Sequence, residues 1–152
     1  MSLRPYPEGM DCVWLASDRT GHLGAFITAG IGPIPIAALD ASVLPIDEVE
    51  SSLCELPQVA QAKLLVSVKR PDDFIDLAER GVFVYDWTDI NRTARDALHV
   101  YEPVAVPVQP ITASALTGDL ATLAKAVQLL NVSFAENNAL DIRRHLSCAE
   151  AE

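Results

Sequence analysis

The segment from residue 11 to residue 35, DCVWLASDRTGHLGAFITAGIGPIP, constrains the fold more than any other part of this chain. Met10–Asp18 and His22–Ala29 both have the composition of β-strands. Between them, Asp18 at the first position and Gly21 at the fourth position favour a type I turn. Strands this close in sequence pair as an antiparallel hairpin, so we predict that the fold begins with one.

Glycines and prolines predict how this hairpin continues. Gly24 lies inside the second predicted strand, which indicates either a β-bulge or the close approach of another group. The Gly30–Pro35 loop that follows has the glycines of a phosphate-binding loop. However, Pro33 and Pro35 lack the backbone N–H groups that such a loop needs. The loop therefore predicts a stiff turn and not a nucleotide site.

The rest of the chain alternates helical and extended patterns. The predicted helices are Ile46–Leu56, Asp72–Arg80 and Thr117–Leu130, and the predicted strands are Ala62–Val68 and Val82–Trp87. Tyr101–Pro110 has three prolines, which favour a covering segment or an edge strand over a central strand. We predict a single α+β domain over residues 1–152, with a mixed or mainly antiparallel sheet of about four to five strands and helices mostly on one face. The alternative is a small α/β fold, because residues 62–87 form a strand–helix–strand unit.

The net charge of −10, from 21 acidic and 11 basic residues, limits the partners of the chain. This charge argues against binding to nucleic acids and to anionic membrane surfaces, because both attract Lys and Arg. It favours binding to a basic protein partner. No apolar run reaches the roughly 18 residues of a membrane span, and the N-terminus lacks the apolar region of a secretory signal. Cys12, Cys54 and Cys148 have no metal or redox spacing, so we expect reduced thiols in a cytoplasmic protein.

No motif predicts catalysis, a metal site or a cofactor. His22, His99 and His145 have no neighbours at metal-ligand spacing, and no GxSxG motif is present. The paired carboxylates of Asp72 and Asp73 are typical of the start of a helix. We therefore expect a protein that is not an enzyme.

Two clusters of polar side chains are candidate binding residues. Asp18 and His22 flank the predicted turn, where they form either half of a catalytic arrangement or an ordinary cross-strand polar pair. Tyr85, Asp86 and Trp87 end a predicted strand, where they form either a binding rim or a plain strand end. Each cluster thus has a functional and a structural interpretation.

The spacing of the N-terminal segment resembles that of a known group of proteins. The pattern is Trp14…Asp18-x-x-Gly21…Phe26-x-Thr28-x-Gly30-x-Gly32-Pro33-x-Pro35. It resembles small uncharacterised bacterial proteins that open with such a hairpin, some of which are similar to immunity proteins of toxin systems. A weaker similarity lies at Gly81–Trp87. The group supplies no catalytic residues, so the resemblance implies a non-enzymatic cytoplasmic role.

The first functional hypothesis is an acidic protein-binding module, with toxin neutralisation as its specific form. Asp47, Glu48 and Glu50 lie on one predicted helix, and they make an acidic face together with the other carboxylates of residues 40–55. A basic toxin domain would bind this face and the aromatic rim, with charge raising the association rate.

Two alternatives belong to other functional classes. A small enzyme or ligand-binding protein requires that four side chains converge on one cleft, namely Asp18, His22, Tyr85 and Asp86. A structural homo-oligomer would place Trp14, Phe26 and the proline-rich segment 103–110 at its interface.

Overall fold

The predicted hairpin is present in the computed structural model of the chain, which describes residues 4–40, 42–59, 61–66, 71–87 and 100–150. β1 (Val13–Asp18) pairs antiparallel with β2 (Leu23–Ile27). Gly24 faces a close neighbour, because a Cβ atom there would lie 2.9 Å from the ring of Phe134. Close approach, and not a bulge, thus explains this glycine.

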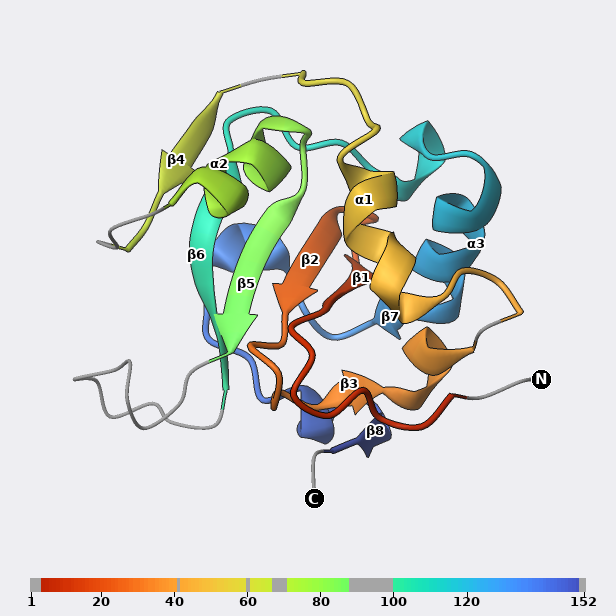
Figure 1. Cartoon of the computed structure of the whole chain (residues 1–152). Coiled ribbons are helices and arrows are strands. Elements are labelled where there is room, and N and C mark those ends of the chain that lie inside the picture. The colour runs from red at the N-terminus through yellow and green to blue at the C-terminus, as the bar shows by residue number, and fades with distance from the viewer. Residues whose placement is uncertain (1–3, 41, 60, 67–70, 88–99, 151–152) are drawn as a thin grey trace.

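The hairpin belongs to a sheet of six strands in the order β4-β6-β5-β2-β1-β7 (Figure 1). The other strands are β3 (Ile34–Pro35), β4 (Ala62–Leu64), β5 (Phe83–Trp87), β6 (Tyr101–Pro107), β7 (Gln128–Leu129) and β8 (Cys148–Ala149). β3 and β8 form a separate two-stranded sheet. The α+β class is confirmed, and the strand count exceeds the prediction because two-residue strands leave no periodic pattern in a sequence.

The sheet is mixed, as predicted. β2 pairs parallel with β5 and β1 pairs parallel with β7, whereas the other neighbouring pairs are antiparallel. β4 and β5 run in the same direction but are separated by β6. The strand–helix–strand unit of residues 62–87 is therefore a crossover that skips one strand.

The proline-rich strand β6 lies between β4 and β5, and not at an edge as the sequence predicts. Pro103 lies beside a register shift between Val84 and Tyr85 of β5. Pro107 is the last residue of β6 and is opposite the first residue of β4. Both prolines thus occupy places where a missing N–H costs little, which is why a central strand accepts them.

Helices are shorter than their sequence patterns predict. They are α1 (Val49–Leu53), α2 (Asp72–Glu79) and α3 (Gly118–Ala126), with 3₁₀ turns at η1 (Ile36–Leu39), η2 (Ile46–Glu48), η3 (Ala113–Ala115), η4 (Phe134–Glu136) and η5 (Ile142–Arg144). The predicted helix 46–56 is a 3₁₀ turn followed by α1. The predicted helix 117–130 ends at Ala126 because the chain enters β7, which leaves Leu130 67% exposed. No helix in the described ranges is long and apolar enough to cross a membrane.

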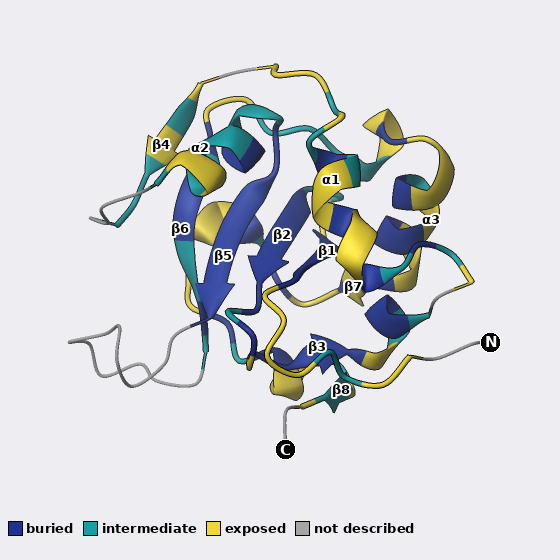
Figure 2. Ribbon diagram, viewed as in Figure 1, coloured by how far each residue is buried: buried dark blue, intermediate teal, exposed yellow. Residues whose placement is uncertain are grey.

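Both faces of the central strands are buried (Figure 2). One face contacts α1, α2 and α3, and the Oγ of Ser17 donates to the carbonyl of Ala124 in α3 at 2.8 Å. The opposite face carries an aromatic stack. In it, the ring centroid of Phe26 lies 4.1 Å from that of Trp14 and 4.7 Å from that of Tyr85. The helices therefore lie on one face as predicted, and aromatic side chains make the core on the other.

Candidate functional site

An acidic pocket opens on the helix-covered face of the sheet. It encloses about 210 Å³ and is lined by Asp11, Val13, Ile27, Ala29, Glu50, Asp73, Phe74 and Asp86. Half of these residues are carboxylates and half are apolar, and none is basic. We call this site the acidic pocket.

The sheet topology brings the pocket residues together from distant parts of the chain. β2 and β5 run parallel and place Ile27 opposite Asp86 where both strands end. α1 packs on β1 and contributes Glu50, whereas α2 packs on β5 and β6 and contributes Asp73. Figure 1 shows β2 between these two helices. The pocket thus lies at the carboxyl ends of a parallel strand pair, between helices that cover its two sides.

The carboxylates of the pocket differ in exposure. Asp86 is only 2% exposed, whereas Asp11, Glu50 and Asp73 are exposed. The Asp11 carboxylate accepts a hydrogen bond from the backbone N–H of Ala29 at 3.0 Å, which holds it beside the end of β2. The pocket therefore has one buried carboxylate and three at its solvent side.

Repulsion between the carboxylates affects nearby titratable groups. Partial burial, followed by the charges of Asp73, Asp11 and Asp76, raises the pKa of Glu50 above its ordinary value of 4.5. Burial, followed by Asp11, Asp47 and Glu50, also raises the pKa of the Cys12 thiol. The local field therefore opposes further negative charge and attracts a cation.

The raised pKa of Glu50 predicts a pH-dependent effect on stability. The folded protein holds this proton more tightly than the unfolded chain, so ionised Glu50 lowers stability above the folded pKa. Glu50→Gln is expected to raise the melting temperature at neutral pH, and the gain is expected to vanish below about pH 4, where both states are protonated. Thermal unfolding followed by circular dichroism at both pH values measures this difference. A gain that is equal at both pH values would contradict the assignment to Glu50 ionisation.

The three acidic residues that the sequence places on the predicted helix 46–56 lie in different surroundings in the structure. Glu50 lines the pocket, but Asp47 and Glu48 are exposed outside it. Asp47 lies 3.5 Å from the guanidinium of Arg4. No group of three or more His, Cys, Asp or Glu side chains in the described ranges is placed to hold a metal ion.

Asp18 and His22 lie at the opposite end of the hairpin from the pocket. The Asp18 carboxylate is buried, and its Oδ1 accepts hydrogen bonds from the backbone N–H groups of Thr20 and His22 at 2.9 and 3.0 Å. The His22 Nδ1 is 3.9 Å from the Asp18 Oδ2. This pair therefore closes the turn, and about 15 Å of strand separates it from the end of β5.

Neither the predicted cleft nor the predicted aromatic rim is present, because β5 is buried on both faces. Tyr85 and Asp86 are neighbours on a strand, so their side chains point to opposite faces and cannot share a cleft. Tyr85 is 1% exposed and Trp87 is 5% exposed, which corrects the prediction of an exposed rim. Trp14 and Phe26 are fully buried as well, so neither supplies the exposed interface that the homo-oligomer hypothesis expects.

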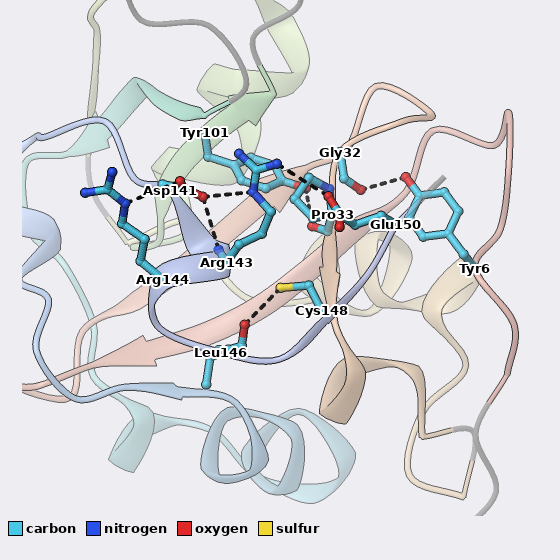
Figure 3. Close-up of polar contacts among 10 residues, drawn as sticks. All are labelled: Tyr6, Gly32, Pro33, Tyr101, Asp141, Arg143, Arg144, Leu146, Cys148 and Glu150. Atoms are coloured by element: carbon cyan, nitrogen blue, oxygen red, sulfur yellow. Dashed lines mark hydrogen bonds and ion pairs between the residues drawn. The ribbon is translucent and has the colours of Figure 1, made fainter. Parts of the chain in front are cut away.

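A second polar cluster lies near the C-terminus and is shown in Figure 3. The Nε of Arg143 is 3.0 Å from the Asp141 Oδ1, and the Nε of Arg144 is 3.5 Å from the Asp141 Oδ2. Arg143 also lies 3.5 Å from Glu150. Two carboxylates thus offset this basic segment, and His99 lies outside the described residues.

The three cysteines are free thiols, as predicted. Burial raises the pKa of Cys12 and of Cys54, and it raises the pKa of Cys148 to about 12. A thiol with a raised pKa stays protonated at neutral pH and is a poor nucleophile.

The sequence marks Glu50 and Asp86 as candidate binding residues but not Asp11 and Asp73, the other two carboxylates of the acidic pocket. The sequence predicts Asp72 and Asp73 at the start of a helix, and both lie in the first turn of α2. Asp11 has no sequence signal of its own. Comparison of the chain with protein-family models, with curated proteins and with solved structures found no match.

Proposed function

We propose that this protein is a non-enzymatic binding module that takes a basic protein partner through the acidic pocket. The observation that carries the proposal is the meeting of four carboxylates, from four separate segments of the chain, around one cavity whose lining contains no basic residue among the described residues. Charge of one sign along a concave surface concentrates ligands of the opposite sign and speeds their association. The net charge of −10 supports the same class of partner.

The test is a titration with an octapeptide of alternating arginine and lysine, followed by amide NMR spectra of the protein at low salt. We expect saturable shifts at the amides of Glu50, Asp73 and Asp86. The double variant Glu50→Gln with Asp73→Asn is expected to bind the peptide about tenfold more weakly, because it removes two charges at the solvent side of the acidic pocket. Added salt should weaken binding to the wild-type protein as well.

Matched controls separate the pocket from the general acidity of the surface. Glu48→Gln removes one exposed charge from the same helical segment, outside the pocket, and should leave the affinity close to that of the wild type. An octapeptide of glutamate should produce no saturable shifts. Equal weakening by Glu48→Gln, or shifts spread over all acidic surfaces, would show that the pocket is not the binding site.

The more specific proposal is that the basic partner is a toxin domain that the protein neutralises. It is supported by the resemblance of residues 13–35 to proteins similar to immunity proteins, and by the absence of a catalytic motif in the sequence. Co-expression with the product of the neighbouring gene tests this form. Recovery of a complex that the double pocket variant loses would support it, and a neighbouring product that forms no complex would count against it.

A further inference from the structure

We infer that the outer edge of β4 binds an extended, acidic segment of a partner protein, which joins the sheet as an additional strand. This surface goes beyond the proposed function, because it lies on another strand than the acidic pocket and attracts the opposite charge. The hydrogen-bonding pattern of β4, its place in the sheet and its charged side chain each support the inference.

β4 is an edge strand of the six-stranded sheet. It stands at one end of the strand order, where β6 is its neighbour among the described strands (Figure 1). Lys63 is exposed, whereas Ala62 and Leu64 are partly exposed and pack against the core (Figure 2). β7 stands at the other end and has two residues, so β4 offers the longer edge. An edge of this kind presents backbone N–H and C=O groups with which another chain can pair.

The bonds between β4 and β6 show which backbone groups of β4 face outward. The Leu65 N–H donates to the Val104 carbonyl at 2.8 Å, which makes these residues a hydrogen-bonded pair. Such pairs alternate along an antiparallel ladder, so Lys63 bonds to β6 whereas Ala62 and Leu64 do not. The N–H and C=O groups of Ala62 and Leu64 therefore point outward, and no other described residue pairs with them. Groups spaced in this way match the backbone of an extended peptide.

Lys63 determines the charge that suits the added strand. It is the one charged residue of β4, and it makes no ion pair with another described residue. A strand bonded to Ala62 and Leu64 would place one residue opposite Lys63 in a non-hydrogen-bonded pair, where side chains approach most closely. An acidic residue at that position would form a favourable cross-strand pair with Lys63.

A second copy of the chain is a poorer occupant of this edge. Antiparallel pairing of two β4 strands about their central residue would set Lys63 against Lys63, and like charges directly opposite destabilise a sheet. Each copy also carries a net charge of −10, which opposes association. Charged side chains on edge strands, lysine above all, prevent edge-to-edge pairing. Lys63 thus disfavours self-association and favours an acidic strand.

The test uses a pentapeptide of threonine, valine, glutamate, valine and threonine with both ends blocked. It is titrated into the full chain, and amide hydrogen exchange is followed by NMR. In the free protein, we expect slow exchange at the Lys63 amide and fast exchange at the Ala62 and Leu64 amides. Saturating peptide should slow exchange at Ala62 and Leu64 at least about tenfold, because these N–H groups gain acceptors. The Lys63 amide, which is already bonded to β6, should change little.

Modified peptides test the register and the charge of the added strand. Methylation of both valine nitrogens removes the donors that face β4, so it should abolish binding. Methylation of the glutamate nitrogen, which faces away from β4 in this register, should leave the affinity close to that of the unmodified peptide. A peptide with lysine in place of glutamate should bind at least about threefold more weakly, because it sets two like charges opposite each other.

Variants of the protein test the assigned groups. Ala62→Pro removes an outward N–H that β6 does not use, so it should weaken binding at least about threefold, with folding checked by circular dichroism. Lys63→Glu should weaken binding about fivefold. Lys125→Glu makes the same charge change at an exposed position of α3 and should bind like the wild type. The double variant Glu50→Gln with Asp73→Asn should bind the peptide at least as tightly as the wild type, because the acidic pocket lies elsewhere.

The outcomes separate this inference from its alternatives. Unchanged exchange at Ala62 and Leu64 with excess peptide would overturn it, and so would equal affinity for the glutamate and lysine peptides. Light scattering that shows a dimer of the free protein, together with slow exchange at Ala62 and Leu64, would assign the edge to a second copy and also overturn it. None of these outcomes affects the proposed function, which the basic octapeptide tests at the acidic pocket.

Discussion

Replacing Phe26 by alanine is expected to lower the free energy of unfolding by about 4 kcal/mol, because the ring lies at the centre of the aromatic core. Phe26 is fully buried and stacks between Trp14 and Tyr85. The edges of Tyr101 and Phe134 also pack against it, with ring centroids at 5.3 and 5.8 Å. Urea denaturation of the variant measures the loss, and thermal unfolding should show a decrease of about 10 °C.

Leu130→Ala is the matched control for this prediction. Leu130 is 67% exposed after the end of α3, so its truncation should change stability by less than about 0.5 kcal/mol. Phe26→Leu keeps part of the buried volume, so its loss of stability should lie between those of Phe26→Ala and Leu130→Ala. A loss below about 1 kcal/mol for Phe26→Ala would mean that the aromatic stack contributes little to the core.

Replacing Asp18 by alanine is expected to lower the free energy of unfolding by about 3 kcal/mol, since it leaves the buried backbone N–H of Phe134 and three partly buried donors without an acceptor. The Oδ1 atom accepts from both the N–H and the hydroxyl of Thr20 and from the N–H of His22. The Oδ2 atom accepts from the backbone N–H of Phe134 at 2.8 Å. One carboxylate thus closes the hairpin turn and ties it to a segment far along the chain.

Asp40 supplies the comparison for Asp18. Its Oδ1 also closes a turn, where it accepts from the N–H and the hydroxyl of Ser42 at 3.0 and 2.6 Å, but this turn is partly exposed. Asp40→Ala is expected to cost about 1 kcal/mol, because water can satisfy the released donors. Equal losses for the two variants in urea denaturation would show that burial of the Asp18 contacts is unimportant.

Asp18 has two interpretations from the sequence, and the structure distinguishes between them. Its place before a turn indicated a structural role, and its pairing with His22 indicated chemistry. The structure favours the first interpretation, since Asp18 is 5% exposed and its carboxylate accepts four hydrogen bonds. A carboxylate that is held in this way is a scaffold for the turn.

Two of the four pocket carboxylates were candidates from sequence, but on separate surfaces. The sequence places Glu50 on the acidic face of a helix and Asp86 in an aromatic rim. They meet because β5 pairs parallel with β2 while α1 packs on the neighbouring strand β1. Parallel pairing joins segments that are far apart in sequence, and no local pattern encodes which segments pair.

The sequence by itself determined the parts of this protein that depend on nearby residues. Turn chemistry at Asp18 and Gly21 predicts the hairpin, and Pro71, the apolar spacing that follows it and Gly81 predict the helix that is α2. The alternation of helical and extended patterns also predicts the α+β class, with a mixed or mainly antiparallel sheet, and the structure confirms the class. The hairpin and the helix depend on backbone preferences and on contacts within a few residues.

Only the tertiary structure decided the strand order, the central place of β6 and the composition of the acidic pocket. Each depends on pairing between segments that are remote in sequence, where the gain from burying both faces of the sheet outweighs local preferences. The same burial placed Tyr85 and Trp87 in the core and left carboxylates around the end of β5. The topology therefore brings the residues of the acidic pocket together, whereas the sequence alone predicts only the acidic charge of the protein.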